Sequence, residues 1–311
     1  MNLRGAPMIV VVVVLVASAG AGCPQVLNRY SVRGPRMLPE TASLDDVVRV
    51  VNQNGAAMQS LVSTDASISA TGTPALRASI ALDRPRRLRV RAETTLTGQE
   101  LDLGSNDELF WVWAKRMDPP AVMFCRHDQY QASAARQFLP IEPEWLVEAL
   151  AATPFDPADR HSGPLPVRGG KLEIRSTRAT ADGSQTKITI VDAQSGWVLE
   201  QHLYDSRGAR LASAMMSQHW RDPASGVTLP KRVEFQLPAA KTSFTLTLGN
   251  VQINQLDPAT PLFAMPSYPG TRLVDLADPS LQFERPVAAP VSYNEPIAAP
   301  PKQARRWRLF R

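Results

Sequence analysis

Apolar and polar residues alternate with a period of two through much of this 311-residue chain, and this alternation constrains the fold more than any other feature. In residues 86–93, Leu88, Val90 and Ala92 fall on one face of an extended chain, and the arginines between them fall on the other. This pattern is typical of an antiparallel strand with one buried face and one solvated face. The sequence predicts strands of this kind at 75–83, 86–93, 99–104, 108–116, 121–127, 170–177, 185–192, 197–205, 210–220, 227–237 and 241–256.

One helix is expected before the first of these strands. Residues 43–61 begin with Ser43, a favoured N-cap, and Asp46 stands three residues later, where a capping box places its acid. Valines, Met58 and a leucine then form a rough apolar stripe. Gly55 weakens the middle of this segment, because glycine is a poor helix former.

A second helix is expected near the middle of the chain. Residues 141–152 place Trp145, Leu146 and their apolar neighbours on one side of a helix, with Pro143 near its start. Two helices and about eleven antiparallel strands define a mainly β, α+β domain. The simplest arrangement is one large curved sheet wrapped around the helices, and a two-sheet sandwich is the alternative.

Two strands depart from the regular alternation. In residues 108–116 the run Phe110, Trp111, Val112 and Trp113 is apolar throughout, so both faces of the sheet must be covered there. A helix on the outer face, or a curled sheet, would provide that cover. In residues 241–256 the apolar positions change parity at Gly249 and the asparagine after it, which predicts a bulge that bends the strand.

The N-terminus carries an export signal. Arg4 precedes an apolar run of about ten residues, too short to cross a bilayer, and small residues follow it up to Cys23. This order resembles the signal of bacterial lipoproteins, which implies cleavage before Cys23 and acylation of its thiol and new amino group. An ordinary signal peptide with an incidental Cys23 is the alternative. Cys125 then has no partner for a disulfide and is expected to be a buried core residue.

The sequence divides into four parts: a signal peptide (1–22), a tether after the lipidated cysteine (23–42), one domain (43–283), and a proline-rich linker with a basic tail (284–311). The formal net charge of +5 comes from the ends, because Arg4 and five basic residues of the last ten account for it. The domain itself is near neutral, so nucleic acid is not an expected partner. The tail could instead contact anionic lipid or a protein partner, or remain solvated.

The order of these features resembles a known family. A signal ending at Cys23, an opening helix and meandering strands that include "LDLGSNDELFWVWA" (101–114) are similar to the periplasmic lipoprotein carriers and outer-membrane receptors of the LolA/LolB type. The likeness covers roughly residues 44–256. It implies an incomplete β-barrel whose mouth is closed by helices and whose apolar hollow holds acyl chains. Cys23 is the only residue of this sequence to which the resemblance assigns a functional role.

No catalytic or metal-binding motif is present in the sequence. The four histidines have no metal-ligand spacing, and there is no nucleophile-elbow or phosphate-loop pattern, so neither an enzyme nor a cofactor is expected. The apolar side chains are the candidates for a ligand site instead. Those expected to line a cavity, or alternatively to pack a solid core, are Trp111, Trp113, Phe124, Trp145, Leu146, Trp197 and Phe235.

These observations predict a lipid-anchored protein of the bacterial envelope that binds an apolar ligand, such as lipid or lipoprotein acyl chains, in an open β-barrel. Pro24 stands where a signal for retention in the inner membrane would have aspartate, which favours the outer membrane, facing the periplasm. The alternatives are an envelope domain with a filled interior that binds a protein partner, and a hydrolase without a recognisable motif.

Overall fold

The computed structural model describes residues 34–281, apart from residues 71–72, 140, 152–154, 181–182 and 258–259. Cys23, the signal peptide before it and the basic tail lie outside the described residues. The predictions made for them stay predictions.

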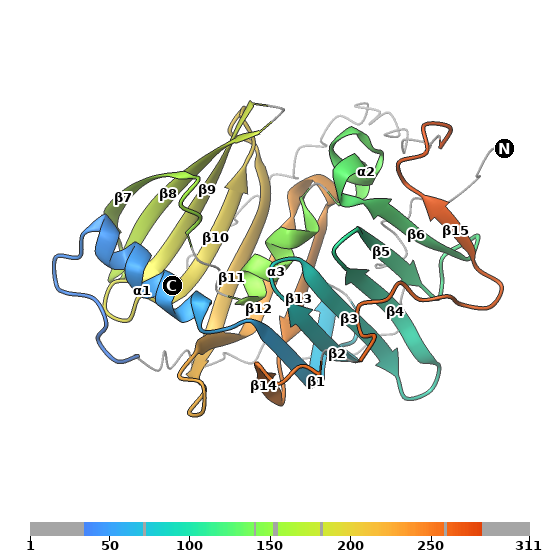
Figure 1. Ribbon diagram of the computed structural model, residues 1–311, viewed down its shortest axis with the longest axis horizontal. Helices are drawn as coiled ribbons and strands as arrows, with labels where there is room; N and C mark the ends of the chain where they lie inside the picture. The colour runs from blue at the N-terminus through green and yellow to red at the C-terminus, as the bar shows by residue number, and fades with distance from the viewer. Residues whose placement is uncertain are drawn as a thin grey trace, which may run out of the picture.

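The described residues form one large, strongly curved sheet, with helices against its concave side (Figure 1). The order across the sheet is β15-β6-β5-β4-β3-β2-β1-β13-β12-β11-β10-β9-β8-β7, and β14 pairs with β1. The strands are β1 (Ser60–Ala70), β2 (Leu76–Asp83), β3 (Arg87–Thr94), β4 (Gly98–Ser105), β5 (Leu109–Ala114), β6 (Ala121–Arg126), β7 (Arg160–Val167), β8 (Lys171–Thr180), β9 (Gly183–Asp192), β10 (Val198–Tyr204), β11 (Arg210–Arg221), β12 (Thr228–Leu237), β13 (Thr242–Thr247), β14 (Val251–Ile253) and β15 (Arg272–Asp275).

The sheet is an incomplete barrel, as predicted. Two antiparallel meanders, β1 to β6 and β7 to β13, meet where β1 pairs with β13, with Ser67 opposite Thr247. The far edges of the sheet, β7 and β15, do not pair with each other, so the barrel stays open. Strand β15 is parallel to β6, whereas the other pairs of described strands are antiparallel.

The described residues contain fifteen strands rather than about eleven, and the reasons are local. The expected strand 241–256 divides into β13 and β14 around Gly249, whose position lies so close to the backbone of Asp65 that no side chain would fit. Strand β7 has no alternation and contains Pro164, but as an edge strand it tolerates a residue without an N–H. Strand β15 is only four residues long. Strand β1 was not predicted, and only its first two residues, Ser60 and Leu61, lie within the predicted first helix.

Helix α1 (Leu44–Ala56) begins as predicted but ends early. The Ser43 hydroxyl accepts from the Asp46 N–H at 3.1 Å, and the Asp46 carboxylate accepts from the Ser43 N–H at 3.1 Å, which completes the capping box. The helix stops one residue after Gly55, and the chain is extended again from Ser60. The prediction of a helix through residue 61 was therefore wrong at its C-terminal end.

Helix α3 (Pro143–Ala151) lies across the middle of the concave face, where it contacts β3 and β12 (Figure 1). Its apolar residues join side chains of both meanders in one continuous core. Residues from each half of the sheet, such as Ile80 and Val233, are fully buried in that core. The remaining helical elements of the described residues are short: η2 (His127–Ala132), α2 (Ala135–Phe138) and η3 (Pro238–Ala240).

The outer face of β5 is covered by an irregular segment, residues 262–268, rather than by the helix or curled sheet that the sequence suggested. Trp111 and Trp113 point to this outer face, and Tyr268 stacks on Trp113 with ring centroids 4.1 Å apart. Arg89, predicted on a solvated face, is only 14% exposed in its side chain and donates to the carbonyl of Leu262 at 2.9 Å. Cys125 is fully buried, as predicted.

Candidate functional site

The side chains predicted to line a cavity lie in three different places. Trp145, Leu146 and Phe235 belong to the main core, where the Trp145 and Phe235 rings meet edge to face at 5.9 Å. Trp111, Trp113 and Phe124 lie on the outer side of the sheet under the segment 262–268. Trp197 stacks on His219 near α1, with ring centroids 5.1 Å apart.

A cavity of about 380 Å³ lies beside α3 in the concave face. Its walls are the turn between β2 and β3, the first half of α3 with the residues before it, the loop after α3, and strands β8, β9 and β10. Trp145, Val147 and Leu203 form the apolar part of the wall, on the side of the main core. Most of the other lining side chains are charged.

Ion pairs compensate most of these charges. The Lys187 Nζ lies 3.0 Å from the Glu148 carboxylate, and Lys187 is only 9% exposed. Arg178 lies 2.7 Å from Asp159 and 2.9 Å from Asp156. The hydrogen bond that Arg178 donates to Asp159 raises the pKa of Arg178, although burial of the guanidinium opposes this. These pairs tie α3 and the loop that follows it to strands β8 and β9.

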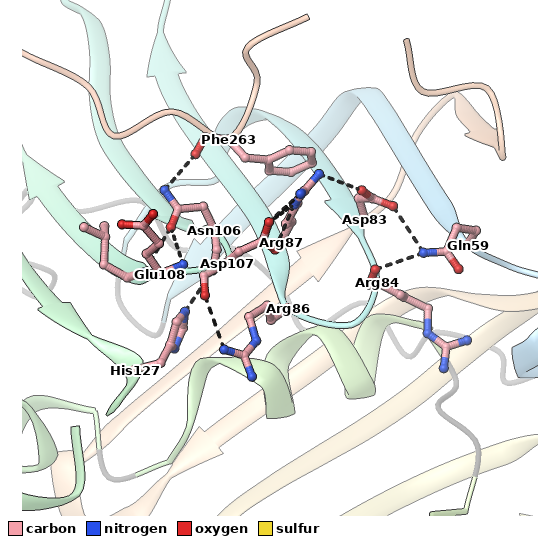
Figure 2. A network of polar contacts seen from close by, with 11 residues as sticks. Gln59, Asp83, Arg84, Arg86, Arg87, Asn106, Asp107, Glu108, His127 and Phe263 are labelled. Atoms are coloured by element: carbon pink, nitrogen blue, oxygen red, sulfur yellow. Dashed lines mark hydrogen bonds and ion pairs between the residues drawn. The ribbon is translucent and has the colours of Figure 1, made fainter. Parts of the chain in front are cut away.

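The turn between β2 and β3 borders the cavity on the opposite side. Figure 2 shows how a polar network holds this turn: Arg87 pairs with Asp107 and also reaches Asp83 at 3.3 Å. Arg86 donates to the carbonyl of Asp107 at 3.4 Å and lies 3.5 Å from Glu144 at the start of α3. The turn is therefore fixed to both the sheet and the helix.

Arg84 behaves differently from the other basic residues of the cavity. Its side chain points away from the cluster around Arg87 (Figure 2). Its Nη1 donates to the carbonyls of Gly55 and Met58, at 2.5 and 3.2 Å, at the end of α1. Among the described residues no carboxylate lies within ion-pair distance of its guanidinium. Burial lowers the pKa of Arg84, against the opposing attraction of Glu148.

Trp145 carries a buried hydrogen-bond donor without a described partner. Its side chain lines the cavity and is 5% exposed, and its indole N–H is buried without a hydrogen-bond partner in the described part of the chain. Buried donors in folded proteins are rarely left without an acceptor, because desolvating an N–H with nothing to bond costs about 1–3 kcal/mol. The indole N–H of Trp145 is therefore a buried donor without an acceptor at the boundary between this cavity and the main core.

A second cavity of about 260 Å³ lies between α1 and the turns at Ser195 and Ser225. Trp197 and His219 form part of its wall. The His219 Nε2 donates to the Val198 carbonyl at 2.8 Å, and burial lowers the pKa of this imidazole. With its Nε2 proton already donated, His219 is a structural group in this wall.

Two histidines lie between a serine and a glutamate, which invites comparison with a hydrolase. The His127 Nε2 lies 3.3 Å from the Ser105 hydroxyl, but it also lies 2.9 Å from the carbonyl of Asn106. That contact requires a proton on Nε2, so this nitrogen cannot accept one from Ser105. Triad chemistry needs the histidine to take up the serine proton.

The second such group is on β10 and β11. The His202 imidazole contacts Ser213 at 2.8 Å and Glu200 at 3.3 Å. Ser213 is 1% exposed and lies in the middle of a strand that is paired on both sides. A nucleophilic serine needs an exposed hydroxyl beside N–H donors that await an oxyanion, and this arrangement supplies neither.

Within residues 34–281, excluding the gaps, no group of three or more histidine, cysteine or acidic side chains is placed to hold a metal ion. In the same residues, no helix is both long and apolar enough to cross a bilayer.

No family model and no curated protein matches this chain. Solved structures with a related shape include a Vibrio parahaemolyticus domain named for outer membrane lipoprotein sorting, with 9% identity and a TM-score of 0.47 over 68% of this chain and 94% of that one. A LolA superfamily protein from Nitrosomonas europaea has 10% identity and a TM-score of 0.45 over 70% of this chain and 97% of that one. A DUF1329 family protein from Desulfovibrio piger has 13% identity and a TM-score of 0.43 over 70% and 95%.

The first two names agree with the LolA/LolB-like resemblance found in the sequence.

The charged residues of the cavity were not predicted. The signal for them is the Arg84-Pro85-Arg86 turn, which places two basic residues between two half-buried strands. Lys187 and Glu148 carried no such signal, because they are 39 residues apart and meet only through the fold.

Proposed function

We propose that this chain is a lipid-anchored protein of the bacterial envelope that binds an apolar chain in the concave face of its sheet, in the space that α3 fills. The observation that carries the proposal is the position of α3. This nine-residue helix packs its apolar side chains into the middle of an open, curved sheet and borders a cavity of about 380 Å³. A ligand would enter from that cavity and take the place of the helix.

The contacts that hold α3 in place are of a kind that a bound ligand can replace. Its buried side chains pack against apolar residues of the sheet, and its two glutamates face the cavity, where Glu144 pairs with Arg86 and Glu148 with Lys187. Apolar contacts are not directional, so an alkyl chain can replace them. The two ion pairs lie at the cavity and would help to hold the helix in its closed position.

The energies of the helix and of an acyl chain are of the same order. Full burial of a large apolar side chain is worth about 1.5–3 kcal/mol, and α3 buries four such residues: Trp145, Leu146, Val147 and Leu150. Each methylene of an alkyl chain contributes about 0.8 kcal/mol when buried. An acyl chain of about ten or more methylenes would therefore offset the undocking of α3.

The proposal of an anchor rests on the sequence around Cys23. Two or three acyl chains on this residue would hold the protein stably on a membrane, since one chain alone gives marginal binding. Pro24 supports the outer membrane, facing the periplasm. Mass spectrometry of the protein from its native host tests the anchor, and an unmodified Cys23 would exclude it.

A direct test weakens the docking of α3. Leu150 is 1% exposed in the main core. Leu150→Ala should lower the free energy of unfolding by about 2–5 kcal/mol, because it removes packing contacts of α3. If α3 competes with the ligand, this variant binds palmitate more tightly than the unmodified chain, although it is less stable. Hydrogen exchange should also show that palmitate removes the amide protection of α3 and leaves that of α1 unchanged.

Leu96→Ala is the matched control, because Leu96 is 94% exposed in the turn between β3 and β4. It should change neither stability nor palmitate binding.

The continuous packing of the main core favours a second candidate, an envelope domain with a filled interior that serves as an interaction module. In that case Leu150→Ala lowers stability with no gain in affinity, and palmitate leaves the exchange of α3 unchanged.

A further inference from the structure

We infer that the second cavity, between α1 and the turns at Ser195 and Ser225, binds a small amphiphilic carboxylate, a molecule with one carboxylate group and a short apolar body. This cavity is separate from the one beside α3, so the inference does not depend on the proposed function. Its volume of about 260 Å³ lies just below the usual range for ligand pockets, about 300–1,000 Å³, which suits a small ligand.

The charge of the lining favours an anion. Arg221, the last residue of β11, is the one fully charged side chain among the described lining residues, and none of these residues is acidic. Its guanidinium lies over Gly226, because a Cβ built on this glycine would be 3.2 Å from the Arg221 Nη2. Burial lowers the pKa of His219, so this lining residue is neutral near pH 7. An anion in the cavity would therefore meet one guanidinium and no opposing carboxylate of the lining.

The acidic residues of the two bordering turns are bound within those turns. The Asp192 carboxylate accepts from the N–H and the hydroxyl of Ser195, at 2.8 and 2.9 Å. The Asp222 carboxylate accepts from the N–H and the hydroxyl of Ser225, at 2.7 and 2.6 Å. In the part of the chain that the structure describes, no carboxylate lies within ion-pair distance of Arg221. Its guanidinium is therefore free to pair with a ligand.

The other walls of the cavity are apolar. Trp197 and His219 stack with ring centroids 5.1 Å apart and an angle of 17° between their planes, and both line the cavity. Val50 and Val51 face them from α1 and are only 7% and 3% exposed. A short alkyl chain would cover these side chains while its carboxylate stayed beside Arg221. An inorganic anion would leave this apolar surface unused.

Hydrogen bonds hold these walls together without a ligand. The Asn54 side chain of α1 donates to the Thr228 carbonyl at 2.9 Å and accepts from the Thr228 N–H at 2.7 Å. The N–H groups of Met37 and Leu38 both donate to the Gln194 carbonyl, at 2.8 and 2.9 Å. The segment before α1, the helix itself and both turns are therefore fixed to one another. Binding in a preformed cavity avoids the entropy cost of ordering its walls.

The test uses probes that share a chain and differ in charge. Octanoate, octanol and octylamine are titrated into the full mature chain by calorimetry at neutral pH, with acetate as the carboxylate that lacks a chain. We expect octanoate to bind more tightly than octanol, and octylamine to bind most weakly of the three. Acetate should bind far more weakly than octanoate, because it buries almost no apolar surface.

Arg221→Gln removes the charge and keeps a polar side chain at an exposed position. It should weaken octanoate binding about tenfold, the effect expected for a hydrogen bond between charged groups, and leave octanol binding unchanged. Arg210→Gln is the matched control, because Arg210 is exposed at the other end of β11 and should affect neither probe. Ala57→Phe places a larger side chain in the cavity wall and should weaken octanoate and octanol alike.

Several results would overturn the inference. Octanoate that fails to bind, or that binds Arg221→Gln as tightly as the unmodified chain, would remove the role of this guanidinium. Octanol or octylamine binding as tightly as octanoate would exclude a carboxylate site, and acetate doing so would exclude an amphiphile. Unchanged octanoate affinity in Ala57→Phe would place the ligand outside this cavity. The proposed function is decided separately, by the variants and hydrogen exchange of α3.

Discussion

Asp102 is the buried carboxylate that fastens the segment 262–268 to the outer face of the sheet, and its removal should be costly. Its side chain is fully buried. It accepts hydrogen bonds from Arg89 at 2.7 and 3.2 Å, Trp111 at 3.2 Å, Gln99 at 3.1 Å and Tyr268 at 2.6 Å. Asp102→Ala leaves the guanidinium of Arg89 in a mostly buried position without its anion.

The magnitude follows from burial. Removing one member of a buried ion pair costs about 3–5 kcal/mol, because the remaining charge stays desolvated. The same sheet offers a matched control in Asp107, which pairs with Arg87 while its side chain is 58% exposed. Exposed pairs contribute about 0.2–1 kcal/mol. Asp102→Ala should therefore destabilise the domain by at least about 2 kcal/mol more than Asp107→Ala.

Urea unfolding followed by circular dichroism measures both variants. With a slope of about 3 kcal/mol per M, Asp102→Ala should lower the midpoint by about 1 M or more, and Asp107→Ala by about 0.3 M or less. Burial and then the hydrogen bond to Asp102 raise the pKa of Tyr268 to about 12, so a tyrosine titration of Asp102→Ala should show this pKa falling. Equal destabilisation by the two variants would refute the argument from burial.

Three further outcomes follow from the described contacts. Gly104→Ala should destabilise the domain by about 1–3 kcal/mol in urea unfolding, because its Cβ would overlap the Trp111 indole; unchanged stability would show that the ring can move aside. Partial burial acts to raise the pKa of Glu200, but the hydrogen bond and charge of Lys171 lower it below 4.5. The contribution of Glu200 to stability is therefore present above that value and lost as the pH falls through the folded-state pKa, and Lys171→Met should flatten this part of the pH–stability curve. Burial raises the pKa of the Cys125 thiol, so it should react with a maleimide at pH 8 only after denaturant is added; rapid labelling of the native protein would contradict its burial.

The sequence alone determined the class of fold. Alternation with a period of two depends only on which residues are apolar, and it identified most of the strands that have one buried and one solvated face, though not β1. The capping box at Ser43 and Asp46 was also readable, because a cap is made by residues three positions apart. The end of α1 was not readable, since the step from Ala56 to Ser60 depends on β1 finding partners in β2 and β13.

Only the tertiary structure decided which apolar residues lie together. Trp111 and Trp145 look alike in the sequence, but the pleat directs Trp111 outward under the segment 262–268, while Trp145 lies inside against Phe235. The charged lining of the cavity is also set by the tertiary structure. Lys187 and Glu148 meet because the sheet curves around α3. Local patterns report which face of a strand is buried, whereas the neighbours on that face are set by how distant strands pair.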